Sequence, residues 1–213
     1  MKKVALLFIA GLTSLSISFA GTQSTDTPHD GGFRLNFHVG SVNKAYGNTV
    51  DNGSDGPKTT LGVEIGTKWN LTTLSGDKMS IGLMADWFSL GYSGYKEKYS
   101  FLGQEESFGV TILNLSVLEV GPSFTYALSD DLALDAYYQI KPTFLVNIYD
   151  GEVETSEAVG INHVIGVAAR YKMFNFGVEP IFGGITRKFE YFGYTEKIKI
   201  NTASVRVVFG FKF

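Results

Sequence analysis

Nine ionisable residues of both signs occupy alternate positions, beside glycines and small residues, in otherwise apolar stretches of the chain. They are Arg34, Glu64, Lys68, Asp86, Glu119, Asp135, Arg170, Glu179 and Arg206. Side chains two residues apart share one face of a β-strand, so these charges are predicted to line one side of a sheet. They could form either a salt-bridged plug or the wall of a narrow polar conduit. Because an unpaired buried charge is costly, the mixture of signs favours the plug.

Other residues with catalytic or metal-binding chemistry are few. The three histidines, His29, His38 and His163, have no serine and acid at a spacing typical of a catalytic set. Residues 51–56, DNGSDG, are similar to a calcium loop, but glycine stands where the third and twelfth positions need ligands. The absence of cysteine excludes disulfides and thiolate metal sites. We therefore predict no catalytic site, no metal site, no cofactor and no enzymatic activity.

The composition indicates a protein built from strands. Aromatic residues make up 14% of the 213 residues, charged residues only 18%, and 25 residues are glycine. Such a chain is poor in helix formers and rich in strand and turn formers. The net charge of −3 becomes −5 without the two lysines of the first twenty residues. This acidic balance argues against nucleic acid as a partner.

The first twenty residues, MKKVALLFIAGLTSLSISFA, have a basic start, a short apolar run and small residues before position 21. This pattern predicts a secretory signal peptide and Sec-dependent export, and the apolar run is too short for a membrane anchor. Residues 21–31 are predicted to be a flexible leader. One domain then follows, over residues 32–213.

Period two recurs through that domain. Alternating apolar residues predict eight strands, near residues 33–40, 61–69, 79–87, 118–126, 132–146, 164–171, 176–183 and 204–213. The connections alternate between short ones (71–78, 128–131, 172–175) and long ones (44–59, 93–108, 149–160, 188–199). In an up-and-down meander every second connection lies at the same end. We therefore predict an all-β, eight-stranded antiparallel transmembrane barrel, with short periplasmic turns and long external loops.

Alternation alone does not say which face points inward, since a soluble barrel would bury the apolar face. The charges of both signs among small residues suit a narrow lumen, which places the apolar face outside. Aromatic residues are expected to form girdles at the two lipid–water interfaces, with the two tryptophans at opposite ends. The predicted girdle residues are Trp69, Trp87, Tyr126, Tyr171, Phe176 and Phe211.

The chain ends in SVRVVFGFKF, with an aromatic residue last and apolar residues at every second position before it. The apolar set is Val205, Val207, Phe209, Phe211 and Phe213. This ending resembles the C-terminal signal that the bacterial barrel-insertion machinery reads. Together with the strand pattern and the loop layout, it makes residues 33–213 resemble the small outer-membrane barrels, the group of OmpX, the OmpA membrane domain, OmpW and the PorT-like proteins.

The resemblance implies a monomer in the outer membrane of a Gram-negative bacterium, in contact with outer-membrane lipid and lipopolysaccharide. We expect a structural or surface-interaction role carried by the external loops, with an extracellular protein as a possible partner. Two alternatives stay open: a porin-like narrow pore for small solutes or lipid, and a lipid-modifying enzyme. The first would need a continuous water path, and the second a His/Ser/acid cluster at the outer rim.

Two further features bear on the loops and strands. Aromatic and charged residues alternate in residues 93–108 and 188–199, which suggests hairpins that recruit a partner by strand addition or pack on each other. The stretch 149–160 is acidic and is expected to be a solvated loop. Pro122, Pro142 and Pro180 fall within strand patterns, and bulges or positions beyond the hydrocarbon zone are expected there.

Overall fold

The computed structural model describes residues 31–44, 59–74, 78–101, 104–149, 152–191 and 194–213. The predicted signal peptide, nearly all of the predicted leader, His29 and the DNGSDG segment lie outside the described residues.

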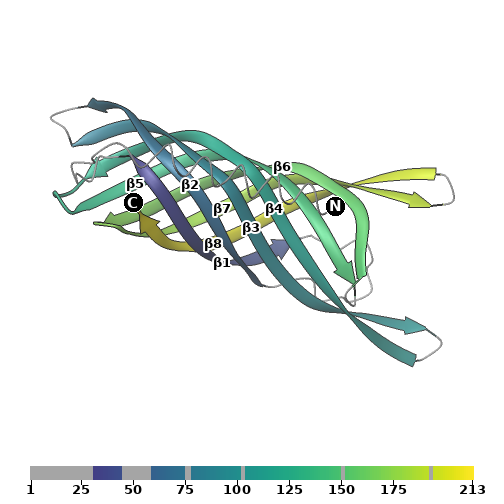
Figure 1. The fold of residues 1–213 in the computed structure, drawn as a ribbon. Helices are drawn as coiled ribbons and strands as arrows, with labels where there is room; N and C mark the ends of the chain where they lie inside the picture. Colours follow the sequence, from purple (N-terminus) through teal and green to yellow (C-terminus); the bar gives the residue numbers. More distant parts are fainter. Residues whose placement is uncertain (1–30, 45–58, 75–77, 102–103, 150–151, 192–193) are drawn as a thin grey trace, which may run out of the picture.

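Eight strands form one closed antiparallel barrel, and each pairs with the next in sequence until the last returns to the first (Figure 1). The strands are β1 (Gly32–Lys44), β2 (Thr59–Leu74), β3 (Met79–Phe101), β4 (Gln104–Ala127), β5 (Leu132–Tyr149), β6 (Glu152–Tyr171), β7 (Phe174–Tyr191) and β8 (Tyr194–Lys212). Closure pairs Leu35 of β1 with Phe211 of β8. The predicted fold class is confirmed.

β5 shows why alternation in the sequence produces this barrel. Its odd-numbered positions from Ala133 to Asn147 are all buried, while the even-numbered positions are partly or fully exposed. Asp135 is 4% exposed, whereas its neighbour Leu134 is 40% exposed. Successive side chains of a strand point to opposite faces, so one face of β5 lies inside the barrel and the other outside.

The exterior is apolar and the interior largely polar, the reverse of a soluble protein. Valines and phenylalanines on the outer face of β7 and β8 are among the most exposed side chains, with Phe176 at 58% and Phe209 at 47%. Glu119 and Gln139, by contrast, have no exposed surface. Among the described residues, no helix is long and apolar enough to cross a membrane. In a closed ring of strands, the backbone N–H and C=O groups are hydrogen-bonded to neighbouring strands, and the apolar side chains of the outer face contact lipid.

The two ends of the barrel differ. The end that carries the carboxyl terminus has tight connections, such as the turn at Lys172, whose φ of 52° is left-handed. At the other end β3 and β4 stay paired as far as Phe101 and Gln104, and β7 and β8 as far as Tyr191 and Tyr194. Figure 1 shows both hairpins projecting beyond the ring.

Three of the predicted long loops are therefore mostly strand. The suggested hairpins of residues 93–108 and 188–199 are confirmed for the backbone. The prediction of a loop at 149–160 is wrong, because β5 continues to Tyr149 and β6 begins at Glu152; the solvation of its acidic side chains stays a prediction. The acidic composition does not prevent strand pairing here, because the β5–β6 ladder continues to the pair of Tyr149 and Glu152.

Two neighbouring bulges change which residues of β3 and β4 face inward. Ile65 and Gly66 of β2 pair with Phe88 and Asp86, so Trp87 is an extra residue in β3. In β4 the register with β5 shifts between Ser116 and Val120, around Leu118, whose φ is 58°. A bulge adds one residue and reverses the alternation beyond it. The prediction missed this reversal because it ended one strand at residue 87 and began the next at 118.

The three strand prolines lie where a ladder is interrupted. Pro142 faces the β4 bulge, as predicted. Pro122 and Pro180 lie in short gaps of the β4–β5 and β6–β7 pairings, and the register is the same on both sides of each gap. The expectation of a bulge is therefore wrong for these two. Proline lacks the N–H that a ladder of hydrogen bonds needs. Each of the three prolines is paired with one neighbouring strand but has no described pairing with the other.

Candidate functional site

The candidate site is the polar interior, and all nine predicted charges are buried in it. Their exposed fractions run from 0 to 6%. The sequence prediction left out two further buried cations, Lys141 and Arg187, and the buried polar residues Tyr137 and Gln139. Tyr137, Gln139 and Lys141 follow Asp135 at intervals of two, so the same alternation could have found them. Arg187 lies in the part of β7 beyond the predicted strand 176–183.

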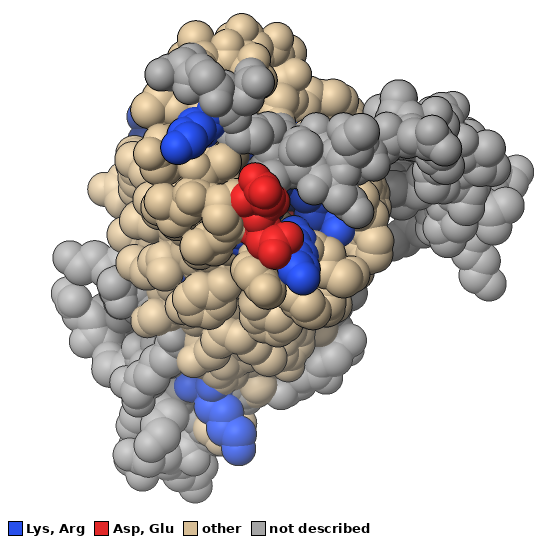
Figure 2. Space-filling view, turned by 90° about the vertical axis from the view of Figure 1, so that its left-hand side faces the viewer, with Lys and Arg blue, Asp and Glu red and all other residues tan. Residues whose placement is uncertain are grey.

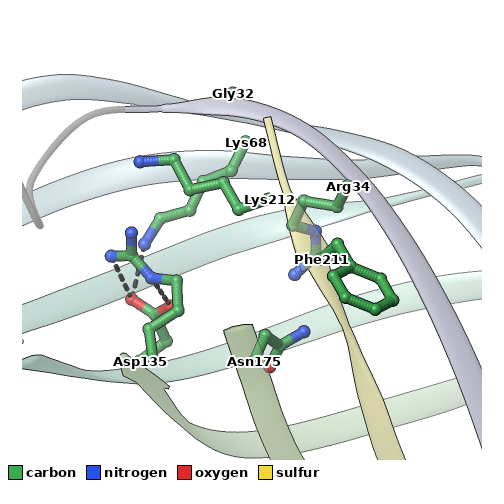
Figure 3. A pocket seen from close by; sticks show the side chains of 8 residues that line it. Gly32, Arg34, Lys68, Asp135, Asn175, Phe211 and Lys212 are labelled. Carbon is green, nitrogen blue, oxygen red and sulfur yellow. Dashed lines mark hydrogen bonds and ion pairs between the residues drawn. The ribbon is translucent and has the colours of Figure 1, made fainter. Parts of the chain in front are cut away.

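The group nearest the turn end is centred on Asp135. Lys68 Nζ lies 2.6 Å from Asp135 Oδ1, and Arg170 Nε lies 2.7 Å from Asp135 Oδ2. Thr125 accepts a hydrogen bond from Lys68 and donates one to Asp135 Oδ1 at 2.6 Å. One carboxylate thus bridges two cations from β2 and β6, which ties three strands together across the lumen (Figure 3).

The next group joins Arg34 of β1 to β3 and β5. Arg34 Nη2 donates to Asp86 Oδ1 at 2.8 Å, and Gln139 Nε2 donates to Asp86 Oδ2 at 2.7 Å. Asp86 reaches this position because of the bulge at Trp87, which keeps it directly opposite Glu119 across the β3–β4 ladder. Two carboxylates on neighbouring strands would repel each other without these donors.

Arg206 of β8 holds the central group together. Its Nη1 lies 2.6 Å from Glu64 Oε1, and its Nε donates to Glu179 Oε2. Tyr137 donates its hydroxyl hydrogen to the other oxygen of Glu179. Arg206 is 3% exposed, so its charge is separated from water and balanced by two carboxylates from β2 and β7.

Lys141 forms the second cationic centre of this layer. Its Nζ donates to Glu119 and, at 3.1 Å, to Ser89 Oγ, and it lies 3.8 Å from Glu64 Oε1. Ser89 donates in turn to Glu64 Oε1 at 3.2 Å. Through Glu64, the contacts of Lys141 and Arg206 become one continuous network that spans six strands, β2, β3, β4, β5, β7 and β8.

His38 is buried beside this network, with an exposed fraction of 4%. Neither of its ring nitrogens has a hydrogen-bond partner among the described residues. The ring occupies the space over Gly62, its partner in the β1–β2 ladder, where an added Cβ would lie 2.3 Å from the ring. Gly62 is therefore required for the close approach of the imidazole.

Towards the hairpin end the interior becomes less polar. Asn162 donates to Thr143 Oγ1 at 2.9 Å and accepts from Thr202. Apolar side chains follow, in a buried cluster of Val110, Ile112, Leu145, Ala158 and Ile185. This layer was not predicted. Val110 and Ile112 face inward through the bulge in β4, and Ala158 and Ile185 lie where β6 and β7 continue beyond the predicted strands. Leu145 obeys the alternation of the predicted strand 132–146 but was not assigned to the interior.

His163, the other histidine considered for catalysis, lies on the outer face near the middle of β6. Its Nδ1 is 2.6 Å from the Tyr138 hydroxyl, and its ring stacks on Phe182 with centroids 5.5 Å apart. The strand predicted at residues 164–171 would place His163 at its outer end, and this is wrong because β6 begins at Glu152. Among the described residues no group of three His, Cys, Asp or Glu is placed to hold a metal ion.

The predicted girdle needs one correction. The rings of Trp69 and Trp87 meet edge to face with centroids 5.7 Å apart, so they do not mark opposite ends of the barrel. Trp87 also donates its indole N–H to Thr67 Oγ1 at 2.9 Å. The error has the same cause as the missed bulge: β3 continues for fourteen residues beyond Trp87 to Phe101, so Trp87 is not at its far end.

The other girdle residues lie near the turn end. Tyr126 pairs with Met79 at the start of β3, and Tyr171 pairs with Phe174 across the turn between β6 and β7. Phe211 contacts Phe174 with ring centroids 5.6 Å apart. These side chains lie on or near one rim of the barrel, next to the exposed Phe213.

The C-terminal residues belong to β8, between β1 and β7. Val205, Val207 and Phe209 are 39 to 47% exposed on the outer face. Phe213 closes the ring through two backbone hydrogen bonds with Phe33, at 2.9 and 3.1 Å. The apolar alternation at the end of the sequence therefore corresponds to one continuous lipid-facing stripe on a central strand of the closed sheet.

This sidedness and the closed ring define the class: the chain is a transmembrane β-barrel of the outer-membrane kind. No family model matches the sequence, and no curated protein matches it. Several solved structures are similar in fold. Ail, the attachment invasion locus protein of Yersinia pestis, has 8% sequence identity and a TM-score of 0.38, and the match covers 86% of this chain and 97% of that one. The outer membrane protein OprG from Pseudomonas aeruginosa has 11% identity and a TM-score of 0.44, with 89% and 99% of the two chains covered. The outer membrane protease OmpT from Escherichia coli has 10% identity and a TM-score of 0.43, with 91% and 99% covered.

The expected resemblance to outer-membrane barrels is thus found at the level of the fold. The prediction that the chain is not an enzyme is corrected, because one of the similar structures is a protease by its name. A barrel of this kind does not exclude catalysis. At 10% identity, however, the similarity does not assign an activity to this chain.

Proposed function

We propose that this chain is an outer-membrane protein with a structural and surface-interaction role, in which a rigid barrel displays projecting hairpins outside the cell. The supporting observation is the length of the β3–β4 and β7–β8 hairpins beyond the ring. β4 pairs with β5 only from Val110 onward, yet it pairs with β3 from Gln104. Among the described residues, the hairpin therefore carries strand edges that pair with no other strand of the barrel.

The β7–β8 hairpin has the same property. β8 pairs with β7 from Tyr194, whereas its described pairing with β1 begins only at Ala203. A strand edge with free N–H and C=O groups can add a strand from another protein. Near the base of this hairpin Lys188 lies directly opposite Lys197, and both side chains are exposed.

The interior supports the structural part of the proposal. The ion pairs link β1, β2, β3, β4, β5, β6, β7 and β8 through the lumen, and the apolar cluster around Ile112 and Ile185 lies above them. These contacts favour a filled lumen over an open conduit. Rigid scaffolds suit loops and hairpins that carry recognition.

The proposal extends to location and assembly. The lipid-facing stripe of β8 is suited to reading by the barrel-insertion machinery, and the apolar belt to contact with outer-membrane lipid and lipopolysaccharide. The turns would face the periplasm and the hairpins the outside, as in other barrels with one short-turn end. We propose a monomer, since the ring leaves no strand edge unpaired within the belt.

The hairpins can be shortened without disturbing the barrel, because the register is known. Residues 97–108 are replaced by Asn-Gly between Lys96 and Gly109, which are paired residues, and residues 188–197 by Asn-Gly between Arg187 and Ile198. Each variant, in nanodiscs, is tested for binding to a panel of immobilised extracellular-matrix proteins, serum proteins and sulfated polysaccharides. The control is Lys172→Ala at the turn end.

Binding by the unmodified protein and the control, with loss in at least one shortened variant, would support the proposal. Binding that is equal in all four proteins, or absent from the whole panel, would contradict it. The heat-modifiable gel shift of each variant shows that the barrel itself has formed.

A further inference from the structure

The outer face of β5 and β6 carries a polar pair, Tyr138 and His163. The described outward-facing positions of these strands, from Leu132 to Ile148 and from Val159 to Tyr171, contain no Asp, Glu, Lys or Arg, and away from the rims Tyr138 and His163 are their polar side chains. Seen from the turn end, most of the described surface around the central acidic side chains is uncharged as well (Figure 2). A polar pair in this surface requires an explanation, because lipid tails offer it no hydrogen bond.

Aromatic contacts fix the position of the imidazole. The His163 ring lies between those of Tyr138 and Phe182, with centroids 5.9 and 5.5 Å apart and interplanar angles of 20° and 23°. His163 also faces Phe182 directly in the β6–β7 ladder. His163 and Tyr138 are half-buried, and His163 Nε2 is not among the buried atoms that lack a partner. The stacked ring therefore turns Nε2 towards the outer surface.

The pair has one hydrogen more than its own hydrogen bond uses. His163 Nδ1 lies 2.6 Å from Tyr138 Oη, and this is the hydrogen bond that the His163 side chain makes within the described part of the chain. If Oη donates to Nδ1, the remaining hydrogen is on Nε2. If Nδ1 donates to Oη, the remaining hydrogen is that of the hydroxyl. In either tautomer the pair presents a donor to the lipid, and an acceptor oxygen would satisfy it.

The height of the pair in the apolar belt indicates which lipid oxygen is within reach. His163 precedes Tyr171, at the turn-end rim, by eight residues of β6. At about 3.3 Å per residue and a strand tilt of roughly 40°, the two residues differ in height by about 20 Å. Since the apolar belt of such a barrel is about 25 Å tall, His163 lies just inside the far boundary of the hydrocarbon. Acyl carbonyl oxygens lie at this boundary, whereas headgroup phosphates lie beyond it.

We propose that Tyr138, His163 and Phe182 form a lipid-binding site on the outside of the barrel, in which the polar pair donates a hydrogen bond to an acyl carbonyl oxygen of lipopolysaccharide. The exposed ring of Phe182 provides an apolar surface for the acyl chain. The choice of lipopolysaccharide rests on the proposed function, which turns the hairpin end outward and so places this site in the outer leaflet. One lipid is thereby held against β5, β6 and β7.

Lipid retention by the refolded barrel tests this site. The protein is mixed in detergent with equal amounts of phosphatidylethanolamine and of lipopolysaccharide without O-antigen, and the bound lipids are counted by native mass spectrometry over a concentration series. One lipopolysaccharide is expected to bind the unmodified protein. His163→Phe keeps an aromatic ring in the stack and removes both ring nitrogens, so it should weaken this binding roughly tenfold.

Tyr171→Phe is the matched control, because Tyr171 is an exposed tyrosine of the same strand at the opposite rim. It should bind lipopolysaccharide like the unmodified protein. Undiminished binding by His163→Phe would overturn the site, and so would an equal loss in Tyr171→Phe. Preferred retention of phosphatidylethanolamine, with the same dependence on His163, would overturn the choice of lipopolysaccharide. The heat-modifiable gel shift shows that each variant has formed its barrel.

A spectroscopic measurement tests the hydrogen bond itself. The imidazole of His163 is observed by ¹⁵N nuclear magnetic resonance in nanodiscs of a dialkyl ether phospholipid, which has no acyl carbonyl oxygen, and its signals are identified by their loss in His163→Phe. Addition of lipopolysaccharide should shift these signals in the unmodified protein and in Tyr171→Phe. Signals that do not respond to lipopolysaccharide would contradict the hydrogen bond.

Failure of this inference is distinguishable from failure of the proposed function. The shortened-hairpin variants keep Tyr138 and His163, so they should retain lipopolysaccharide even where they lose binding to the panel. His163→Phe keeps both hairpins and should bind the panel like the unmodified protein. Loss of lipopolysaccharide on shortening a hairpin would place the lipid site elsewhere and overturn its assignment to Tyr138 and His163.

Discussion

Replacement of Arg206 by alanine should destabilise the barrel more than any replacement of a surface charge. Arg206 lies between Glu64 and Glu179, and its side chain is 3% exposed. Without it, Lys141 is the remaining cation within 4 Å of Glu64 among the described residues, and Glu179 keeps only the Tyr137 hydroxyl among its described partners. Two carboxylates would then be buried without adequate compensation.

Removing one partner of a buried ion pair typically costs about 3–5 kcal/mol. The whole stability of a domain is about 5–15 kcal/mol, so the loss is large enough to measure without ambiguity. The assay is equilibrium unfolding in urea of the refolded barrel in detergent, followed by tryptophan fluorescence and by the heat-modifiable gel shift. Lys172→Ala serves as the control, since its exposed pair with Asp131 contributes at most about 1 kcal/mol.

A double variant separates loss of charge balance from loss of packing. Arg206→Met together with Glu179→Gln removes one charge of each sign and keeps most of the volume, so it should recover much of the loss. An Arg206→Ala barrel as stable as the Lys172→Ala barrel would refute the reasoning that the interior network holds the strands together. The comparison that separates the two is with Arg206→Met alone, which keeps most of the volume but leaves Glu179 charged. A double variant no more stable than Arg206→Met would show that packing, not charge, is responsible.

Four other outcomes are expected. Gly62→Val should cost about 1–3 kcal/mol in urea unfolding, because its Cβ would lie 2.3 Å from the His38 ring and from the Leu90 carbonyl oxygen. Gly184→Ala is the control and should change stability little, because the atom nearest to its added Cβ would be 3.6 Å away. Equal losses of stability in the two variants would contradict the close approach of His38 to Gly62. Single-tryptophan variants made by Trp69→Phe and Trp87→Phe should show the same quenching depth with brominated lipids, since the two rings touch, and two different depths would disprove that contact. Leu134→Gly should lose about 1 kcal/mol more than Leu118→Gly, because only Leu118 has a left-handed φ, and equal losses would argue against strain at the bulge. In planar bilayers the protein should give no large, steady open steps, and their appearance would show that the lumen is not filled.

The sequence was sufficient for the architecture because lipid imposes one rule on every strand. Apolar residues at every second position must all face hydrocarbon, and the polar residues between them must all face inward. Residues such as Asp135, Arg170 and Arg206 could therefore be assigned to one shared interior without knowing which strands are neighbours. The alternation of short and long connections gave the strand count and the two unlike ends.

The same reasoning failed where alternation stopped. Trp87 and Leu118 mark two adjacent bulges, and each reverses the inward face of the residues beyond it. The positions of Val110 and Ile112 inside the barrel could not be read from period two alone. Trp69 and Trp87 were assigned to opposite ends because the length of β3 was underestimated, and Lys141 was left out of the network although it obeys the alternation.

The sequence by itself determined that the chain forms strands, how many there are and, outside the extended parts of β3 and β4 beyond their bulges, which side of each meets lipid, because these are local properties of alternating side chains. Only the tertiary structure decided which charges meet. Asp135 contacts Lys68 and Arg170, at separations of 67 and 35 residues, because strand tilt and register bring three distant segments to one height in the lumen. Pairing across a closed barrel depends on that geometry, and residue types alone do not encode it.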